Sequence, residues 1–182
     1  MFETAKNLIE DASSIVIVQA ENPDGDSLGS ALALEEIFGD MGKNVQLHCP
    51  VELPKYLRYI SGWDRVVTEL NTSADLIILV DTTAEILLSK TLEIHGARHA
   101  FETKPVLVID HHITESTLTF PYNLVSEQAV STSQVIYHMS VESGWNINAQ
   151  AAENLLVALM SDSRGLTTQN STAESFFVAG KL

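Results

Sequence analysis

Cysteine and basic residues are scarce in this chain of 182 residues. The one cysteine, Cys49, permits no internal disulfide and no thiolate metal cluster, and we interpret it as a buried or incidental thiol. Lysine and arginine total 10 against 24 acidic residues, so the formal net charge is −14. A protein that tracks a long nucleic acid needs a stripe of basic side chains. The charge therefore disfavours long duplex nucleic acid as a partner.

Long apolar runs are also missing. No run approaches the roughly 20 residues of a membrane span, and residues 1–10 lack the basic start and apolar core of a signal peptide. We expect a cytoplasmic protein without a membrane partner. A glycine-rich loop ending in Lys and Ser or Thr is absent too, which argues against a nucleoside triphosphatase.

The pattern of apolar residues alternates between strands and helices. Buried or short strands are predicted at residues 14–20, 44–48, 75–80 and 106–109, and an extended segment at 118–125. Helices are predicted at residues 3–11, 28–41, 54–60, in the first part of 83–104, from a cap at 131–133 to 142, from 148 to 162, and at 172–179. This order predicts an α/β fold with a mostly parallel sheet and helices on both faces, in one domain over residues 1–182.

Acids and imidazoles follow the predicted strands at the points where they end. They are Asp24 and Asp26 after the first strand, Asp81 after the third, and Asp110, His111 and His112 after the fourth. Asp162 ends a later apolar helix. Because ligands bind at the carboxyl ends of strands in open α/β sheets, we expect these side chains to share one site.

The donor types in this group suit a divalent cation. Oxygen and imidazole ligands without sulfur favour Mn²⁺ over Mg²⁺. Asp24 and Asp26 are two residues apart, so in an extended loop they could face the same way and serve two ions. Converging carboxylates would repel each other without a cation, and two ions roughly 3.5–4 Å apart would relieve that repulsion.

A second histidine pair has the spacing of two ligands on one helix face. His95 and His99 are four residues apart. No acid follows the usual zinc-hydrolase pattern. We therefore interpret both histidines as exposed or structural.

Four segments in order resemble the motifs of the DHH phosphoesterase family. They are NPDGDSLGS at 22–30, VDT at 80–82, DHH at 110–112, and Asp162 after its helix; residues 125–136 are also similar to a Ser/Thr-rich helix start of that family. The resemblance covers nearly the whole chain. The family includes oligoribonucleotide and phosphoadenosine-phosphate phosphatases, cyclic-dinucleotide phosphodiesterases, single-strand exonucleases and inorganic pyrophosphatases, which use Mn²⁺ or Mg²⁺.

The resemblance implies a set of metal ligands. Asp24 and Asp81 would hold one ion, while Asp26, Asp81, His111 and Asp162 would hold the other, with Asp81 bridging. A hydroxide activated by both ions would attack phosphorus. The implied activity is hydrolysis of a phosphodiester or phosphomonoester in a small nucleotide or short oligonucleotide.

The same resemblance gives roles to two residues of the DHH segment itself. His112 would face the phosphoryl group, where it could stabilise charge or assist the leaving oxygen. Asp110 would lie behind the site and orient a histidine through a hydrogen bond.

The chain departs from the family pattern at three places. Ala20 stands where the family has a histidine ligand of the first ion, so we expect that ion to bind weakly, unless Glu21 substitutes, and activity to be impaired. Residues 161–164, SDSR, stand where the family has a threonine-flanked acid followed by glycine, and we interpret Arg164 as a surface residue rather than a phosphate contact. Nothing resembles the family's C-terminal lobe, so we expect an isolated catalytic lobe.

Two alternatives stay open at this stage. One is a catalytically weak or inactive pseudoenzyme that binds a nucleotide or a partner through the same cleft. The other is a phosphatase with Asp24 as nucleophile. The second is disfavoured because three residues separate Asp24 from its strand, and because it leaves His111 and His112 without a role.

Overall fold

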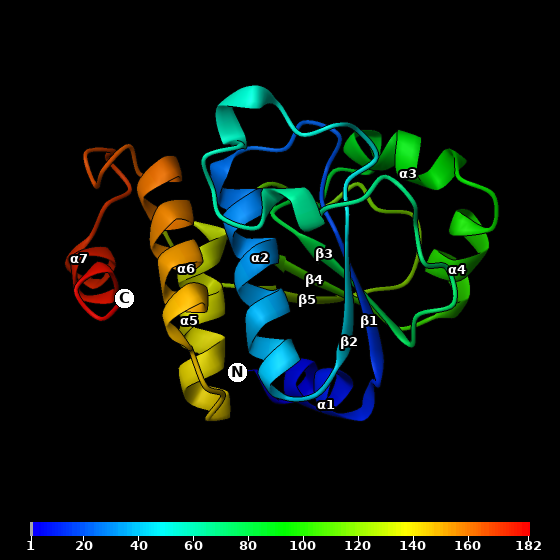
Figure 1. Ribbon diagram of the computed structural model, residues 1–182, viewed down its shortest axis with the longest axis horizontal. Helices are drawn as coiled ribbons and strands as arrows, with labels where there is room; N and C mark the ends of the chain where they lie inside the picture. The colour runs from blue at the N-terminus through cyan, green and yellow to red at the C-terminus, as the bar shows by residue number, and fades with distance from the viewer. Residues whose placement is uncertain (1) are drawn as a thin grey trace.

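The computed structural model describes residues 2–182 and contains a five-stranded sheet whose neighbouring strands all run parallel. The strands stand in the order β2-β1-β3-β4-β5 (Figure 1). Their bounds are Ser14–Val18 for β1, Asn44–His48 for β2, Leu76–Val80 for β3, Val106–Asp110 for β4 and Asn123–Ser126 for β5. The predicted parallel sheet is confirmed. Of the segment expected to be extended at 118–125, only the end pairs with the sheet.

Helices cover both faces of this sheet, as predicted (Figure 1). On one face lie α1 (Glu3–Asp11), α2 (Gly25–Asp40), α5 (Thr132–Ser143) and α6 (Ala149–Asp162). On the other lie α3 (Ser89–Glu93) and α4 (Ala97–Thr103), while α7 (Ala173–Ala179) packs against α5. Within residues 2–182, no helix combines the length and apolar character that a membrane crossing needs.

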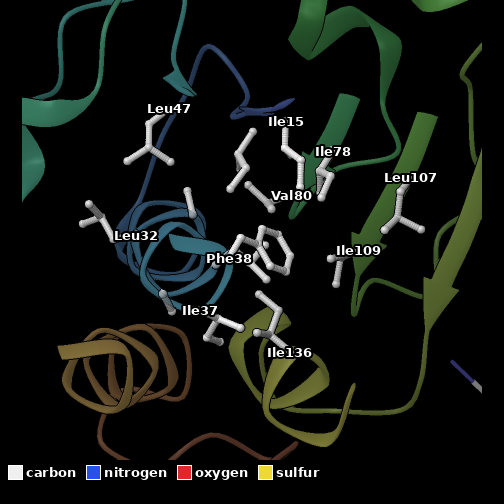
Figure 2. Packing of buried hydrophobic residues seen from close by; sticks show 14 of the residues in the cluster. Ile15, Leu32, Ile37, Phe38, Leu47, Ile78, Val80, Leu107, Ile109 and Ile136 are labelled. Atoms are coloured by element: carbon white, nitrogen blue, oxygen red, sulfur yellow. The ribbon is translucent and has the colours of Figure 1, made fainter. Parts of the chain in front are cut away.

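Two hydrophobic cores separate these layers, because successive residues of a strand point to opposite faces. In β1, Ile15 and Ile17 join the core beneath α2, whereas Val16 and Val18 join the core beneath α3 and α4. Figure 2 shows Phe38 of α2 and Ile136 of α5 packed against the sheet in the larger core. The central strands are buried on both sides, which explains their nearly continuous apolar sequences.

Polar caps set the starts of the later helices where the sequence predicts them. The side chains of Ser131, Asn148 and Thr172 accept hydrogen bonds from backbone N–H groups in the first turns of α5, α6 and α7. Gly144 ends α5 in the left-handed conformation, with φ of +75°.

Helix α2 begins earlier than the expected start near residue 28. The Asp24 carboxylate accepts a hydrogen bond from Ser27 N at 2.9 Å, and Ser27 Oγ accepts one from Asp24 N at 3.0 Å. This reciprocal cap starts the helix at Gly25. The expected extended loop carrying both acids is therefore wrong: Asp24 caps α2, and Asp26 belongs to its first turn.

The segment from 83 to 104 is broken more often than expected. A 3₁₀ turn, Glu85–Leu88, precedes α3, and Gly96, with φ of +81°, separates α3 from α4. His95 lies in the turn between the helices and His99 lies in α4, so the two histidines share no helix face. The helix expected at 54–60 shortens to a 3₁₀ turn, Lys55–Leu57.

Glycine allows α2 and α6 to pack closely. A Cβ atom on Gly29 would lie 2.7 Å from Asn154 O and 2.9 Å from the Cβ of Ala158. One turn earlier, a Cβ atom on Gly25 would lie 2.1 Å from Ser161 Oγ. This close approach brings the first turn of α2, with Asp26, beside the last turn of α6, with Asp162.

Candidate metal centre

The seven predicted site residues gather at the carboxyl edge of the sheet. Asp81 follows β3, Asp110 ends β4, and His111 and His112 come next. Helices supply the others, at the start of α2 and at the end of α6. Two neighbouring strands and two close-packed helices thus hold the group together.

His111 lies at the centre of the group. Its Nε2 atom stands 3.9 Å from Asp26 Oδ2, 3.7 Å from Asp81 Oδ1 and 3.5 Å from Asp162 Oδ2. Donor atoms around one small divalent ion stand roughly 3–4 Å apart. Asp26, His111 and Asp162 therefore have the spacing of ligands to one ion, and Asp81 forms a group with His111 and His112 instead.

The backbone sets the orientation of the His111 ring. His111 Nδ1 stands 3.3 Å from the carbonyl oxygen of Ala129. Because a carbonyl oxygen only accepts, Nδ1 carries the proton in this bond, and Nε2 presents its lone pair to the carboxylates. Burial lowers the pKa of His111, which favours this neutral, metal-binding form.

The second group of donor atoms within 4.8 Å of one another comprises Asp81, His111 and His112. His112 Nδ1 is 3.8 Å from Asp81 Oδ1. In the part of the chain that the structure describes, Asp24 joins neither this group nor the group of Asp26, His111 and Asp162. The structure thus concentrates the donors on the side of His111 rather than on that of Asp24.

Asp26 is buried against the start of α5. Its carboxylate accepts hydrogen bonds from Thr132 N at 2.7 Å, Ser133 N at 3.2 Å and Ser30 Oγ at 3.2 Å. Burial nevertheless raises the pKa of Asp26 to about 7, with the charges of Asp162 and Asp24 adding to the shift. Without a cation, a substantial fraction of this carboxyl group is therefore protonated near neutral pH.

Asp81 is placed under similar constraints. Its Oδ1 accepts a hydrogen bond from Thr132 Oγ1 at 2.7 Å, while burial and then the charge of Asp26 raise its pKa well above the usual value. Its backbone has φ of +63°, a conformation that costs energy for a residue with a side chain. Asp81 follows the last residue of β3 and, in this strained conformation, lies beside His111.

Thr132 and Ser133 belong to the site, although the sequence indicated them only as part of a predicted helix start. Both touch Asp26 through backbone N–H groups, which any residue except proline offers. The only signal was the Ser/Thr-rich segment at residues 125–136. That segment places the start of α5 but does not reveal which acid the helix faces.

His112 and Asp110 form a hydrogen-bonded pair. Asp110 Oδ1 accepts from His112 Nδ1 at 2.6 Å and from His112 N at 3.2 Å. This bond raises the pKa of His112, in contrast to that of its neighbour His111. The His112 side chain is 49% exposed, so its remaining ring nitrogen is available to a ligand.

A cleft of about 230 Å³ adjoins the site on the side of Ala20. Its lining includes Ala20, Asn22, Asp24, Asp81 and His112. The methyl group of Ala20 offers no donor atom, so this side has fewer potential ligands than the side of His111.

Glu21 does not compensate for the missing donor. Its Oε1 accepts a hydrogen bond from Ser89 Oγ at 3.2 Å, and its Oε2 lies 3.9 Å from Lys90 Nζ. Glu21 thus faces α3 and is not part of the cleft lining. The structure therefore gives no support to the expectation that Glu21 replaces the first ion's ligand.

Two other interpretations of individual residues hold. Cys49 is fully buried, with its Sγ atom 3.5 Å from Ala20 O, and burial raises the pKa of its thiol. Arg164 is exposed at the surface beyond α6.

The negative charge of the carboxylates, like their spacing, suits a divalent cation. Within residues 2–182, no lysine or arginine forms an ion pair with Asp24, Asp26, Asp81, Asp110 or Asp162. Asp110 Oδ2 is also buried without a hydrogen-bond partner. Buried carboxylates without a cationic partner are costly. A bound divalent ion would offset that cost.

The parallel sheet and the acid–imidazole cluster at its carboxyl edge define an α/β protein with a candidate divalent-metal centre. The family model described as "DHH family, N-terminal domain" matches residues 14–160. The chain therefore belongs to the DHH family.

Curated relatives match the chain along nearly its whole length. The bifunctional oligoribonuclease and PAP phosphatase NrnA of Mycoplasma genitalium is 27% identical over 179 residues, which cover 98% of this chain and 55% of the relative. A probable manganese-dependent inorganic pyrophosphatase of Enterococcus faecalis is 29% identical over 177 residues, covering 93% and 54%. The chain thus spans about half the length of the curated relatives it matches.

Solved structures share the fold. An exopolyphosphatase-related protein from Bacteroides fragilis superposes with a TM-score of 0.87 at 23% identity, covering 99% of this chain and 55% of that one. The exonuclease RecJ bound to manganese superposes with a TM-score of 0.56 at 15% identity, covering 98% and 46%.

Proposed function

We propose that this chain is the catalytic lobe of a Mn²⁺- or Mg²⁺-dependent phosphoesterase acting on a small nucleotide or a short oligonucleotide. The observation that carries the proposal is the position of His111 Nε2, 3.5–3.9 Å from oxygens of three carboxylates. Relatives named for oligoribonuclease, PAP phosphatase and pyrophosphatase activities support it. The described residues form one sheet with its covering helices, which supports a single lobe.

In this proposal Asp26, Asp81, His111 and Asp162 would hold the principal ion. When bound, the ion would lower the pKa of a bound water and offset charge on the phosphate oxygens. The protein contributes orientation. The N–H groups of Thr132 and Ser133 hold the carboxylate of Asp26, and Ala129 O holds the ring of His111.

In this proposal His112 acts on the substrate directly. Asp110 accepts from its Nδ1 atom and raises its pKa, which favours the doubly protonated ring, whose Nε2–H group would face the cleft. From there His112 would donate a hydrogen bond to a phosphoryl oxygen or to the leaving oxygen. Asp110 is a positioning residue, because it acts through His112.

We propose that the other side of the site binds its ion weakly. Asp24, the shared Asp81 and water would remain as ligands there, because Ala20 supplies none and Glu21 faces α3. Hydrolysis would then be slower than in a site with both ions tightly bound. The same feature favours the second candidate, a pseudoenzyme that binds a nucleotide without turnover.

Metal titration combined with a hydrolysis assay tests the proposal. We expect one tight Mn²⁺ equivalent and slow Mn²⁺-dependent hydrolysis of a diribonucleotide, both lost in Asp81→Asn. Mn²⁺ binding and nucleotide binding without turnover would favour the pseudoenzyme. Hydrolysis that persists in Asp81→Asn would overturn the metal-centred proposal, and phosphate covalently trapped on Asp24 would point to the nucleophile alternative.

A further inference from the structure

A second cleft lies on the other side of His112. Its volume is about 290 Å³, and its walls include His111, His112, Ile113, Gln128, Gln169 and Asn170. His112 borders this cleft as well as the one beside Ala20. A group bound through His112 therefore has space for a substituent in each direction.

Apart from His111 and His112, the second cleft is lined by uncharged residues. Gln128, Gln169 and Asn170 bring three primary amides, and these exposed side chains make no hydrogen bond to protein groups in residues 2–182. Among the described residues that line the cleft, none is a lysine, arginine, aspartate or glutamate. A second phosphate group would call for cationic partners, whereas an amide offers a donor and an acceptor side by side.

The cleft also has an apolar wall. Ile113, next to His112, is 94% exposed, which is unusual for a large aliphatic side chain. Ala129 and the buried Val130 add to this wall from the segment before α5. A ligand with a flat apolar face would cover Ile113 and gain from removing it from water.

We infer that this cleft binds the nucleobase of a nucleotide whose phosphate lies at His112. A base combines an apolar face with donors and acceptors along its edge, and asparagine and glutamine pair with such edges through their amides. The inference rests on the proposed function and adds where the base of its nucleotide substrate would bind.

Comparing two ligands that share a phosphate isolates the base. Adenosine monophosphate and methyl phosphate would be titrated, each with Mn²⁺, into the full chain and into the double variant Gln128→Ala with Asn170→Ala. We expect adenosine monophosphate to bind at least about tenfold more tightly than methyl phosphate. The double variant should lose most of that preference and keep its affinity for methyl phosphate. Asn7→Ala, which removes an exposed amide from α1, is the matched control and should behave as the unmodified chain.

Three results would overturn the inference. They are equal affinities for the two ligands in the unmodified chain, a preference that survives in the double variant, and a parallel loss of both affinities in that variant. Hydrolysis is measured separately. A base preference that depends on Gln128 and Asn170 in a chain without turnover would uphold the cleft assignment while rejecting the enzymatic function.

Discussion

The two sides of the candidate metal centre offer different numbers of potential ligands. On the side of His111, one imidazole and three carboxylate oxygens converge, and the start of α5 holds Asp26 through two backbone N–H groups. On the side of Ala20, a methyl group lines the cleft, and Asp24 uses a carboxylate oxygen to cap α2. The two sides share Asp81.

This difference shows that a shared fold does not guarantee the same donor atoms on both sides. Each ligand removed from an ion leaves its charge less compensated, and a backbone in the right place cannot replace a missing donor atom. We therefore expect the side of His111 to determine metal affinity. We expect the side of Ala20 to limit the rate of hydrolysis.

Replacing one acid on each side should give the largest difference in Mn²⁺ affinity. Asp26→Asn removes a proposed ligand, so the Mn²⁺ dissociation constant should rise by more than the roughly 10–100-fold typical of an outer-shell partner. Asp24→Asn should change the tight site by less than about tenfold, and the helix cap should survive because asparagine caps as well as aspartate. Calorimetric titration measures both. Equal losses in the two variants would contradict the asymmetry.

Adding a metal ligand on the side of Ala20 should reduce the difference in Mn²⁺ binding between the two sides. In Ala20→His we expect a second Mn²⁺ equivalent and at least a roughly tenfold faster hydrolysis of a diribonucleotide. Ala20→Leu adds bulk without a donor atom and serves as the control. If the histidine variant binds no more Mn²⁺ than the leucine variant, the assignment of Ala20 to the weak site fails.

A methyl group added to α2 should lower thermal stability where α2 packs closely against α6, but not where it meets no neighbouring atoms. Gly29→Ala places a methyl group 2.7 Å from Asn154 O, and overpacking of this kind costs about 1–3 kcal/mol, or roughly 3–10 °C in Tm. Gly39 lies in the same helix, and a Cβ atom added to it would meet no other atom within 4 Å. Gly39→Ala should therefore raise Tm by up to about 4 °C. Thermal unfolding checks both signs, and a stabilising Gly29→Ala would contradict this account of the packing.

The raised pKa of Asp26, on the side of His111, should have a smaller effect, which is a change of thermal stability with pH in the metal-free protein. Burial raises the pKa of Asp26 to about 7, above the value of about 3.9 in an unfolded chain. The protonated group therefore contributes its full stability below about pH 4, and this stability is lost as pH rises through about 7. We expect Tm without metal to fall by several degrees between pH 4.5 and 7.5, and the fall to be smaller in Asp26→Asn. An identical pH profile in that variant would argue against the assignment.

Much of the site could be predicted because its residues lie at positions that the chain order itself defines. Asp81 and Asp110 come at the ends of apolar strands, and parallel strands align their carboxyl ends. The start of α2 was misjudged, because a reciprocal cap between Asp24 and Ser27 extended the helix over Asp26. Local capping outweighed the glycine and proline signals of the loop.

Sequence alone determined the parallel α/β architecture, the order of the acids and imidazoles, and the missing donor at Ala20. The first two follow from apolar periodicity and residue type, which are local properties, and the third is what the resemblance to the DHH family implies. Only the tertiary structure decided that the start of α5 holds Asp26, that Glu21 turns to α3, and that an amide-lined cleft adjoins His112. Such contacts join segments far apart in the chain, and they depend on how closely helices pack rather than on any pattern within one segment.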